Sequence, residues 1–235
     1  MAHRFQTTNW SLVLAARSGA TEHSRAALAV LCESYWYPIY AFIRSRGQAP
    51  EDSRDLTQAY FTQLLDKGYL DDVRREAGRF RSFLFASVCH FLSNERDRAQ
   101  AAKRGSGRRP LPLELDSAEK KYRIEPVDDM TPEKVYERHW ALAVLERALA
   151  RLQDEQSGPE MAARARRLLP YLTGEEPSSH REVAEELGMS EAAVRQAVHR
   201  MRKRFGQFLR QEVGQTVADP AAVDSELRHL LAALG

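Results

Sequence analysis

Apolar residues recur every three or four positions along this chain, and this spacing constrains the fold more than any other feature. The clearest row is Leu28, Leu31, Tyr35, Ile39 and Phe42, which marks one face of a long helix. Similar rows begin near positions 50 and 80, and no segment shows the sustained alternation of a half-buried strand. We therefore predict an all-α fold.

Two helical domains joined by a charged linker are predicted. The first covers residues 8–102. The linker, 103–137, begins with turn formers and basic residues that have no apolar period, and its part from 114 onward holds eight acidic and four basic residues. Helical spacing resumes after Thr131-Pro132-Glu133, and we place the second domain at 138–213.

Residues 214–235 form a C-terminal extension with one short amphipathic helix. Its apolar residues are Leu227, Leu230, Leu231 and Leu234. The extension either folds back on the second domain or docks on a partner, and the pattern is compatible with both arrangements.

The most specific motif of the chain lies between His180 and Arg200 and has the order of a helix-turn-helix. Ala184 is small where two helices approach closely, and Gly188 supplies a left-handed turn four residues later. Ser190 is placed to cap the second helix. The apolar residues expected to pack this pair of helices are Val183, Leu187, Met189, Val194 and Val198.

The second helix of the motif carries a basic face. Between positions 195 and 210 there are six basic residues and no acidic one. A basic face is usually only a solvated surface, but a turn motif built to present this helix favours DNA binding. We expect base-edge contacts from Arg195, Gln196, His199 and Arg200. We expect phosphate contacts from Arg202, Lys203 and Arg204.

A second basic stretch follows an unusually aromatic helix. The basic residues are Arg96, Arg98, Lys103, Arg104, Arg108 and Arg109, and the aromatic ones are Phe80, Phe83, Phe85 and Phe91. Phenylalanines at helical spacing more often form a core than a platform for stacked bases. However, Phe85 lies off the apolar stripe, and an exposed ring beside six cations fits a groove for single-stranded nucleic acid.

Composition and motif content argue against other classes of protein. The net charge of +2 excludes a uniformly basic coat, and no apolar run approaches the roughly 20 residues of a membrane span. Two cysteines fit a reducing cytoplasm. Cys89 and His90 are adjacent, so their side chains diverge on a helix, and no nucleophile elbow or glycine-rich phosphate loop is present. We expect a cytoplasmic protein without metal, cofactor or enzymatic activity.

Taken together, these features resemble a bacterial RNA polymerase sigma factor of the extracytoplasmic-function (ECF) group, over roughly residues 10–213. Residues 55–61 (DLTQAYF) resemble the family's helix that binds the clamp helices of the largest polymerase subunit. Residues 80–85 (FRSFLF), followed by 94–98, resemble the promoter-melting and −10 recognition segment. Residues 188–202 resemble the motif that reads the −35 element.

The resemblance implies partners and site residues. The partners are core RNA polymerase and promoter DNA, and an anti-sigma protein is a further partner that this family allows. The implied polymerase-binding residues are Asp55, Leu56, Gln58 and Phe61. The implied residues for −10 recognition and melting are Phe80, Phe83, Phe85, His90, Asn94, Arg96 and Arg98. The implied −35 residues are Ser190, Arg195, Gln196, His199, Arg200, Arg202, Lys203 and Arg204.

Three positions depart from the family pattern. Ala59 stands where an acid commonly follows the glutamine, Phe83 stands where tryptophan is usual, and His90 stands where asparagine is usual. The opening segment 7–11 and the closing segment 226–230 resemble a planctomycete subgroup.

The alternative interpretation is a helix-turn-helix regulator whose first domain senses a ligand or partner and does not bind core polymerase.

Overall fold

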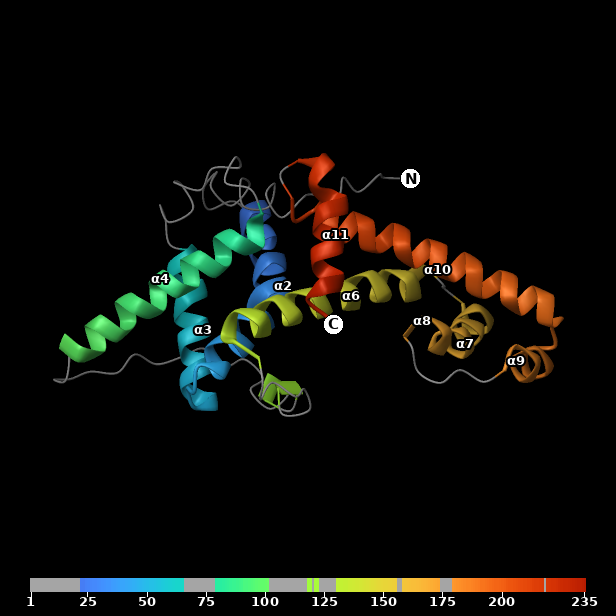
Figure 1. The fold of residues 1–235 in the computed structure, drawn as a ribbon, viewed down its shortest axis with the longest axis horizontal. Coiled ribbons are helices and arrows are strands. Elements are labelled where there is room, and N and C mark those ends of the chain that lie inside the picture. Colours follow the sequence, from blue (N-terminus) through green and yellow to red (C-terminus); the bar gives the residue numbers. More distant parts are fainter. Residues whose placement is uncertain are drawn as a thin grey trace. The chain divides into compact units, whose positions relative to one another are not determined.

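The computed structural model describes residues 22–65, 79–101, 118–119, 121–122, 130–155, 158–173, 179–217 and 219–235. Every regular element in these ranges is helical, which confirms the predicted all-α fold (Figure 1). The predicted basic residues 103–109 and the opening segment 7–11 lie outside the described residues. None of the described helices combines the length and apolar character that crossing a bilayer requires.

The helices follow one another in a simple order. They are α2 (Glu22–Ser45), α3 (Pro50–Leu65), α4 (Phe80–Ala101), α6 (Pro132–Glu155), α7 (Pro159–Leu168), α8 (Pro170–Thr173), α9 (His180–Leu187), α10 (Glu191–Gly214), η2 (Pro220–Ala222) and α11 (Val223–Ala232).

Proline begins several of these helices. Pro50, Pro132 and Pro159 each occupy a first helical position, where the missing N–H is not needed and the restricted φ suits a helix. The helix expected at Pro50 and the helix expected after Thr131 therefore begin where the sequence indicates.

The chain divides into two compact units. The first unit comprises residues 1–143 together with 213–235, and the second comprises 144–212. The division falls within α6 and within α10. The C-terminal extension thus belongs with the first unit, which differs from one of the two arrangements considered, packing on the second domain. The finer domain boundaries at 102, 137 and 213 remain predictions.

The core of the first unit is rich in aromatic rings. Tyr35 meets the edge of Phe80 at 5.4 Å between ring centroids, and Tyr60 meets Phe91 at 5.6 Å. These rings come from α2, α3 and α4, at the positions that the helical spacing marks as apolar. Trp140, on α6, is also fully buried.

The core of the second unit is mainly aliphatic, with Tyr171 and Phe208 as buried aromatic members. It joins α6, α9 and α10 through Leu152, Val183, Val194 and Val198, and Met201 adds a flexible side chain. Two arginines of α6 also hold the end of α10, because Arg147 Nε and Arg151 Nη1 donate to the buried carboxylate of Glu212 at 3.2 and 2.9 Å.

Candidate nucleic-acid interface

The turn between α9 and α10 has a specific hydrogen-bonded geometry. Gly188 has φ of 62°, a left-handed conformation that disfavours any residue with a side chain. The amide of Met189 donates to Ala184 O at 2.9 Å, and the amide of Gly188 donates to Glu185 O. This pair of bonds is a Schellman motif, which satisfies the last carbonyls of α9 and sets the direction in which α10 leaves.

Both helices of the motif begin at serine caps. Ser190 Oγ accepts a hydrogen bond from the amide of Ala193 at 3.2 Å, so the predicted cap of α10 is confirmed. At α9, Ser179 and Glu182 form a reciprocal capping box: Ser179 Oγ accepts from the amide of Glu182, and the Glu182 carboxylate accepts from the amide of Ser179. The sequence signal for this box is a serine followed three residues later by a glutamate, a pattern that the sequence analysis missed.

The base-edge candidates all lie on the exposed side of α10. Arg195, Gln196, His199 and Arg200 are exposed, while Val194 and Val198 of the same helix are buried. Arg195 Nη1 donates to Glu191 one turn earlier at 2.7 Å. Since both groups are exposed, this ion pair is weak and can exchange for a DNA partner.

The three phosphate candidates have different surroundings. Lys203 is exposed, whereas Arg202 Nη2 donates to the carbonyl of Tyr171 at 2.9 Å. Arg204 forms an ion pair with Glu155 through two hydrogen bonds, one of them from Nε at 2.6 Å. This hydrogen bond lowers the pKa of the Glu155 carboxyl below its usual value. Arg202 and Arg204 therefore fasten α10 to neighbouring elements of its own unit.

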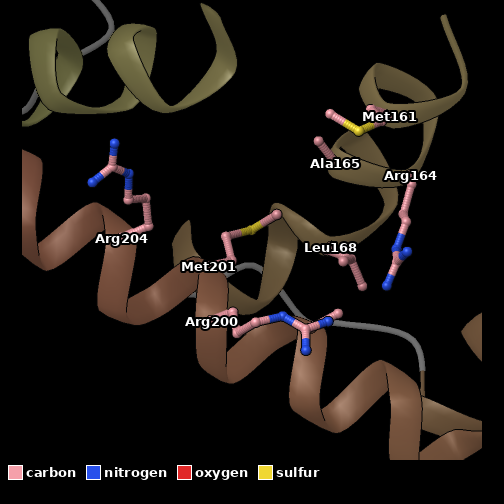
Figure 2. Close-up of a pocket in the computed structure, with 8 residues that line it drawn as sticks. Met161, Arg164, Ala165, Leu168, Arg200, Met201 and Arg204 are labelled. Carbon is pink, nitrogen blue, oxygen red and sulfur yellow. The ribbon is translucent and has the colours of Figure 1, made fainter. Parts of the chain in front are cut away.

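A hollow of about 300 Å³ lies beside the basic face, between α7 and α10. Figure 2 shows Arg164 on α7 and Arg200 on α10 extending toward the same space, with Leu168 beside both side chains. Met201 of α10 is a further apolar residue of the lining. Arg204 also lines it, and none of the lining residues is acidic. The basic surface of α10 thus continues onto α7.

The predicted −10 residues divide between the surface and the interior of α4. Phe83, His90 and Asn94 are spaced by seven and four residues, which places them on one face of the helix. Of these, His90 is exposed, and Phe83 and Asn94 are half-buried. By contrast, Phe80 has no exposed surface, so its ring supports the segment from within the core. Arg96 and Arg98 are both exposed at the far end, and Arg98 pairs with Glu95 at 2.7 Å.

The expectation that Phe85 presents a free ring is wrong. Its ring is half-buried and packs against Phe42 at 5.1 Å and Tyr136 at 5.3 Å between centroids. Tyr136 comes from α6, more than fifty positions along the chain, so the periodicity of α4 alone could not reveal the covering. Phe85 therefore lies on a different face of α4 from Phe83, His90 and Asn94, and this face packs against α2 and α6.

The predicted polymerase-binding residues lie on α3. Asp55 is exposed, Leu56 and Gln58 are half-buried, and the Asp55 carboxylate accepts a hydrogen bond from Arg54 at 3.3 Å. Phe61 is buried and packs against Tyr60, so its contribution is to hold α3 in place. The accessible part of this predicted surface consists of Asp55, Leu56 and Gln58.

Sequence reasoning missed a charged cluster at the start of α4. Arg81 is only 4% exposed and its guanidinium binds Glu226 of α11, with Nε donating at 2.6 Å. A signal did exist, because Arg81 has the same helical phase as the buried Leu84 and Val88, and Glu226 has the same phase as Leu230. A charged residue on an apolar stripe indicates a buried ion pair.

The apolar face of α11 also differs from the prediction. Leu230 is fully buried, but Leu231 is 61% exposed. The buried side chains are Glu226 and Leu230, which are four residues apart on one face of the helix. The charged Glu226 therefore belongs to the buried face, and Leu231 does not. Choosing residues by their apolar character alone therefore assigned Leu231 to the wrong face.

The described residues contain no cluster of three or more side chains suited to a metal ion. Burial raises the pKa of the Cys89 thiol, which disfavours the thiolate that binds metals.

Comparison with known proteins agrees with the geometry of the second unit. The family model described as "Sigma-70, region 4" matches residues 175–205, which include α9, the turn and most of the basic face of α10. Region 4 of this family is a non-enzymatic DNA-binding region. Searches of curated proteins and of solved structures gave no significant match. The matched region supports a sigma-70 family factor, or a related DNA-binding protein, with a role in promoter recognition.

Proposed function

We propose that this chain is an ECF-type sigma factor, which binds core RNA polymerase, directs it to specific promoters and helps to open the DNA. The observation that carries the proposal is the exposed basic face of α10, presented by a capped helix-turn-helix within the region that matches sigma-70 region 4. In this mechanism the chain performs no covalent chemistry. Its binding energy selects the promoter and stabilises the opened strand.

Promoter choice is assigned to α10. Its exposed face carries two pairs of residues that are each one helical turn apart, Arg195 with His199 and Gln196 with Arg200. This spacing suits the major groove. Each well-formed pair between a side chain and a base contributes about 1–3 kcal/mol of discrimination. The basic residues beside this row, and Arg164 across the hollow, add sequence-independent attraction to phosphates, which weakens as salt increases.

Polymerase binding and strand opening are assigned to the first unit. Asp55 and Gln58 are three residues apart on α3 and can engage one partner surface. On α4, the row of Phe83, His90 and Asn94 offers an aromatic ring and polar groups to an unstacked base of the −10 element. Since unstacking a base costs a few kcal/mol per step, the contacts between this row and the base must contribute a similar favourable binding free energy.

Co-elution with core polymerase tests the proposal first. The full chain should co-elute with core polymerase in the absence of DNA, and the Asp55→Ala/Gln58→Ala variant should do so less, while Glu51→Gln at the start of the same helix should not differ from the parent. A chain that binds promoter duplex but never associates with core polymerase would be the helix-turn-helix regulator described above.

Mapping of transcription start sites then tests the role of α10. The Arg195→Ala/Arg200→Ala variant should lose at least about tenfold of its transcription from the parent start sites, because two base-reading side chains are removed. It should still bind core polymerase. Arg166→Ala/Arg181→Ala removes the same charge from other exposed positions of the unit and is the matched control. Unchanged start-site use by the α10 variant refutes the assignment of Arg195 and Arg200.

A further inference from the structure

Among the described residues of the first unit, Glu226 of the C-terminal helix α11 is the most fully buried charged group. Its side chain has no exposed surface. The carboxylate accepts hydrogen bonds from Arg81 Nε at 2.6 Å and Arg81 Nη2 at 3.4 Å, and it forms an ion pair with Arg79 Nε at 2.8 Å. One acidic residue near the end of the chain thus holds two arginines that flank the first residue of α4.

Arg81 is enclosed by other groups as well. Its Nη1 donates to Glu137 of α6 at 3.1 Å, and its guanidinium lies over the ring of Trp140, 4.8 Å from the centroid. The carbonyl of Arg81 accepts from the hydroxyl of Tyr136 at 3.0 Å. The side chain and the backbone of Arg81 are thus both held in place. The positive charges of Arg79 and Arg81 are balanced by the carboxylates of Glu226 and Glu137.

The C-terminal segment also provides a backbone contact to α4. The amide of Phe80 donates to the carbonyl of Thr216 at 3.2 Å. The first amides of a helix have no acceptor within the helix itself, so the C-terminal segment satisfies one of them. Thr216, Val217 and Leu230 are all buried, which makes this segment a part of the first unit's core and not a loosely attached tail.

We propose that Glu226 is a positioning residue for promoter opening: by holding Arg79 and Arg81, it fixes the first turn of α4. This inference rests on the proposed function, because it assigns Glu226 to the segment that is proposed to capture the −10 base. Glu226 does not touch DNA. It acts through α4, whose first turn sets the direction and rotation of the helix that carries Phe83, His90 and Asn94.

Removal of the carboxylate charge has a specific consequence. Among the described residues, Glu137 is then the one carboxylate left for Arg79 and Arg81, so the cluster keeps one uncompensated positive charge. Such a charge is strongly unfavourable when buried, and the arginines relax toward water. The first turn of α4 then moves or frays. The row that captures the base is displaced, and a displacement of about 1 Å is enough to reduce a reaction that depends on positioning.

The experiment compares the full-length parent with Glu226→Gln, with Arg228→Gln on the exposed side of α11 as the matched control. With core polymerase on a promoter, unpaired thymines are followed by their permanganate reactivity. Opening by Glu226→Gln should fall by about tenfold or more, while co-elution with core polymerase and binding to −35 duplex stay within about twofold of the parent. Arg228→Gln should behave as the parent in all three measurements.

Hydrogen exchange on the free protein provides a readout that does not involve DNA. The amides of residues 80–84 should exchange at least about tenfold faster in Glu226→Gln than in the parent, and those of α9 should not change. If Glu226→Gln does not fold, Arg79→Gln replaces it, because Arg79 is partly exposed and loses only one of the contacts to the carboxylate.

The outcomes separate the inference from the proposed function. Parental or faster opening by a folded Glu226→Gln overturns the positioning role, and faster opening identifies the segment as an inhibitory cover. If the parent itself never opens a promoter, the proposed function fails. Hydrogen exchange then still tests the structural part of the inference, that Glu226 fixes the first turn of α4, and unchanged protection of residues 80–84 overturns it.

Discussion

Arg204 and Glu155 show how a single pair of residues couples the stability of the second unit to pH. Arg204 lies on α10 and donates through Nε and Nη2 to the carboxylate of Glu155, the last residue of α6. This hydrogen bond, the largest cause, lowers the pKa of Glu155 in the folded protein. The unfolded chain therefore binds a proton at this carboxyl more readily than the folded protein does.

The sign of the resulting pH dependence follows from linkage. A group with a lowered pKa in the folded state stabilises the fold above its unfolded pKa, and this contribution is lost as pH falls through the folded pKa. The free energy of unfolding of Glu155→Gln should thus be below that of the parent at neutral pH and approach it in acid. Because the pair is largely exposed, the difference should be small and should shrink with added salt.

Chemical denaturation across this pH range measures the effect. Arg204→Gln should also abolish the part of the pH dependence of unfolding that comes from this pair. In the double variant Arg204→Gln/Glu155→Gln, the free energy of unfolding should then differ little from that of Arg204→Gln alone. Equal pH dependence in the parent and in both single variants would mean that the pair does not form in solution.

At the scale of the element, the turn between α9 and α10 depends on one glycine. Gly188 has a positive φ, and a Cβ added there would meet no atom within 4 Å. Gly188→Ala should consequently cost about 1–2 kcal/mol through backbone strain alone, without any steric clash.

Gly206 provides the matched control, since it lies on the exposed side of α10 with ordinary helical geometry and equally open surroundings. Gly206→Ala should stabilise the protein by up to about 1 kcal/mol, because alanine favours the helix. Urea denaturation of both variants tests the opposite signs. Destabilisation by both substitutions to a similar degree would contradict the conformational explanation.

The same turn shows why part of the interface could be predicted from sequence. The positions of Ala184, Gly188 and Ser190 are local requirements of a helix pair, and the contacts that satisfy them span only a few residues. The exposure of the α10 face follows from the phase of Val194 and Val198. By contrast, the ring of Phe85 is covered by Tyr136, a residue of another element, and a local pattern contains no information about such a neighbour.

At the scale of the whole molecule, the C-terminal helix is part of the first unit although it lies at the end of the chain. Leu230 is fully buried, whereas its neighbour Leu231 is 61% exposed. Leu230→Ala should destabilise the first unit by about 2–5 kcal/mol, the usual cost of removing a buried leucine side chain. Leu231→Ala changes the same atoms at the surface and should stay close to the parent.

Hydrogen exchange resolves where the loss occurs. In Leu230→Ala, amides of α4 and of the first part of α6 should lose protection, while those of α9 should keep it, because α9 belongs to the other unit. A loss of protection at α9 equal to that at α4 would show that the two units do not respond separately.

The sequence alone determined most of the long helices, the starts of those at Pro50, Phe80 and Pro132, and the helix-turn-helix, because these depend on spacing and on capping residues within about one or two turns. It did not indicate the short helices α7 and α8. Tertiary structure decided which charged residues are buried together. Arg81 and Glu226 are 145 positions apart, and each shows only that it lies on an apolar stripe. Their pairing exists because the folded chain brings α11 to the start of α4, where two opposite charges can leave water only by binding each other.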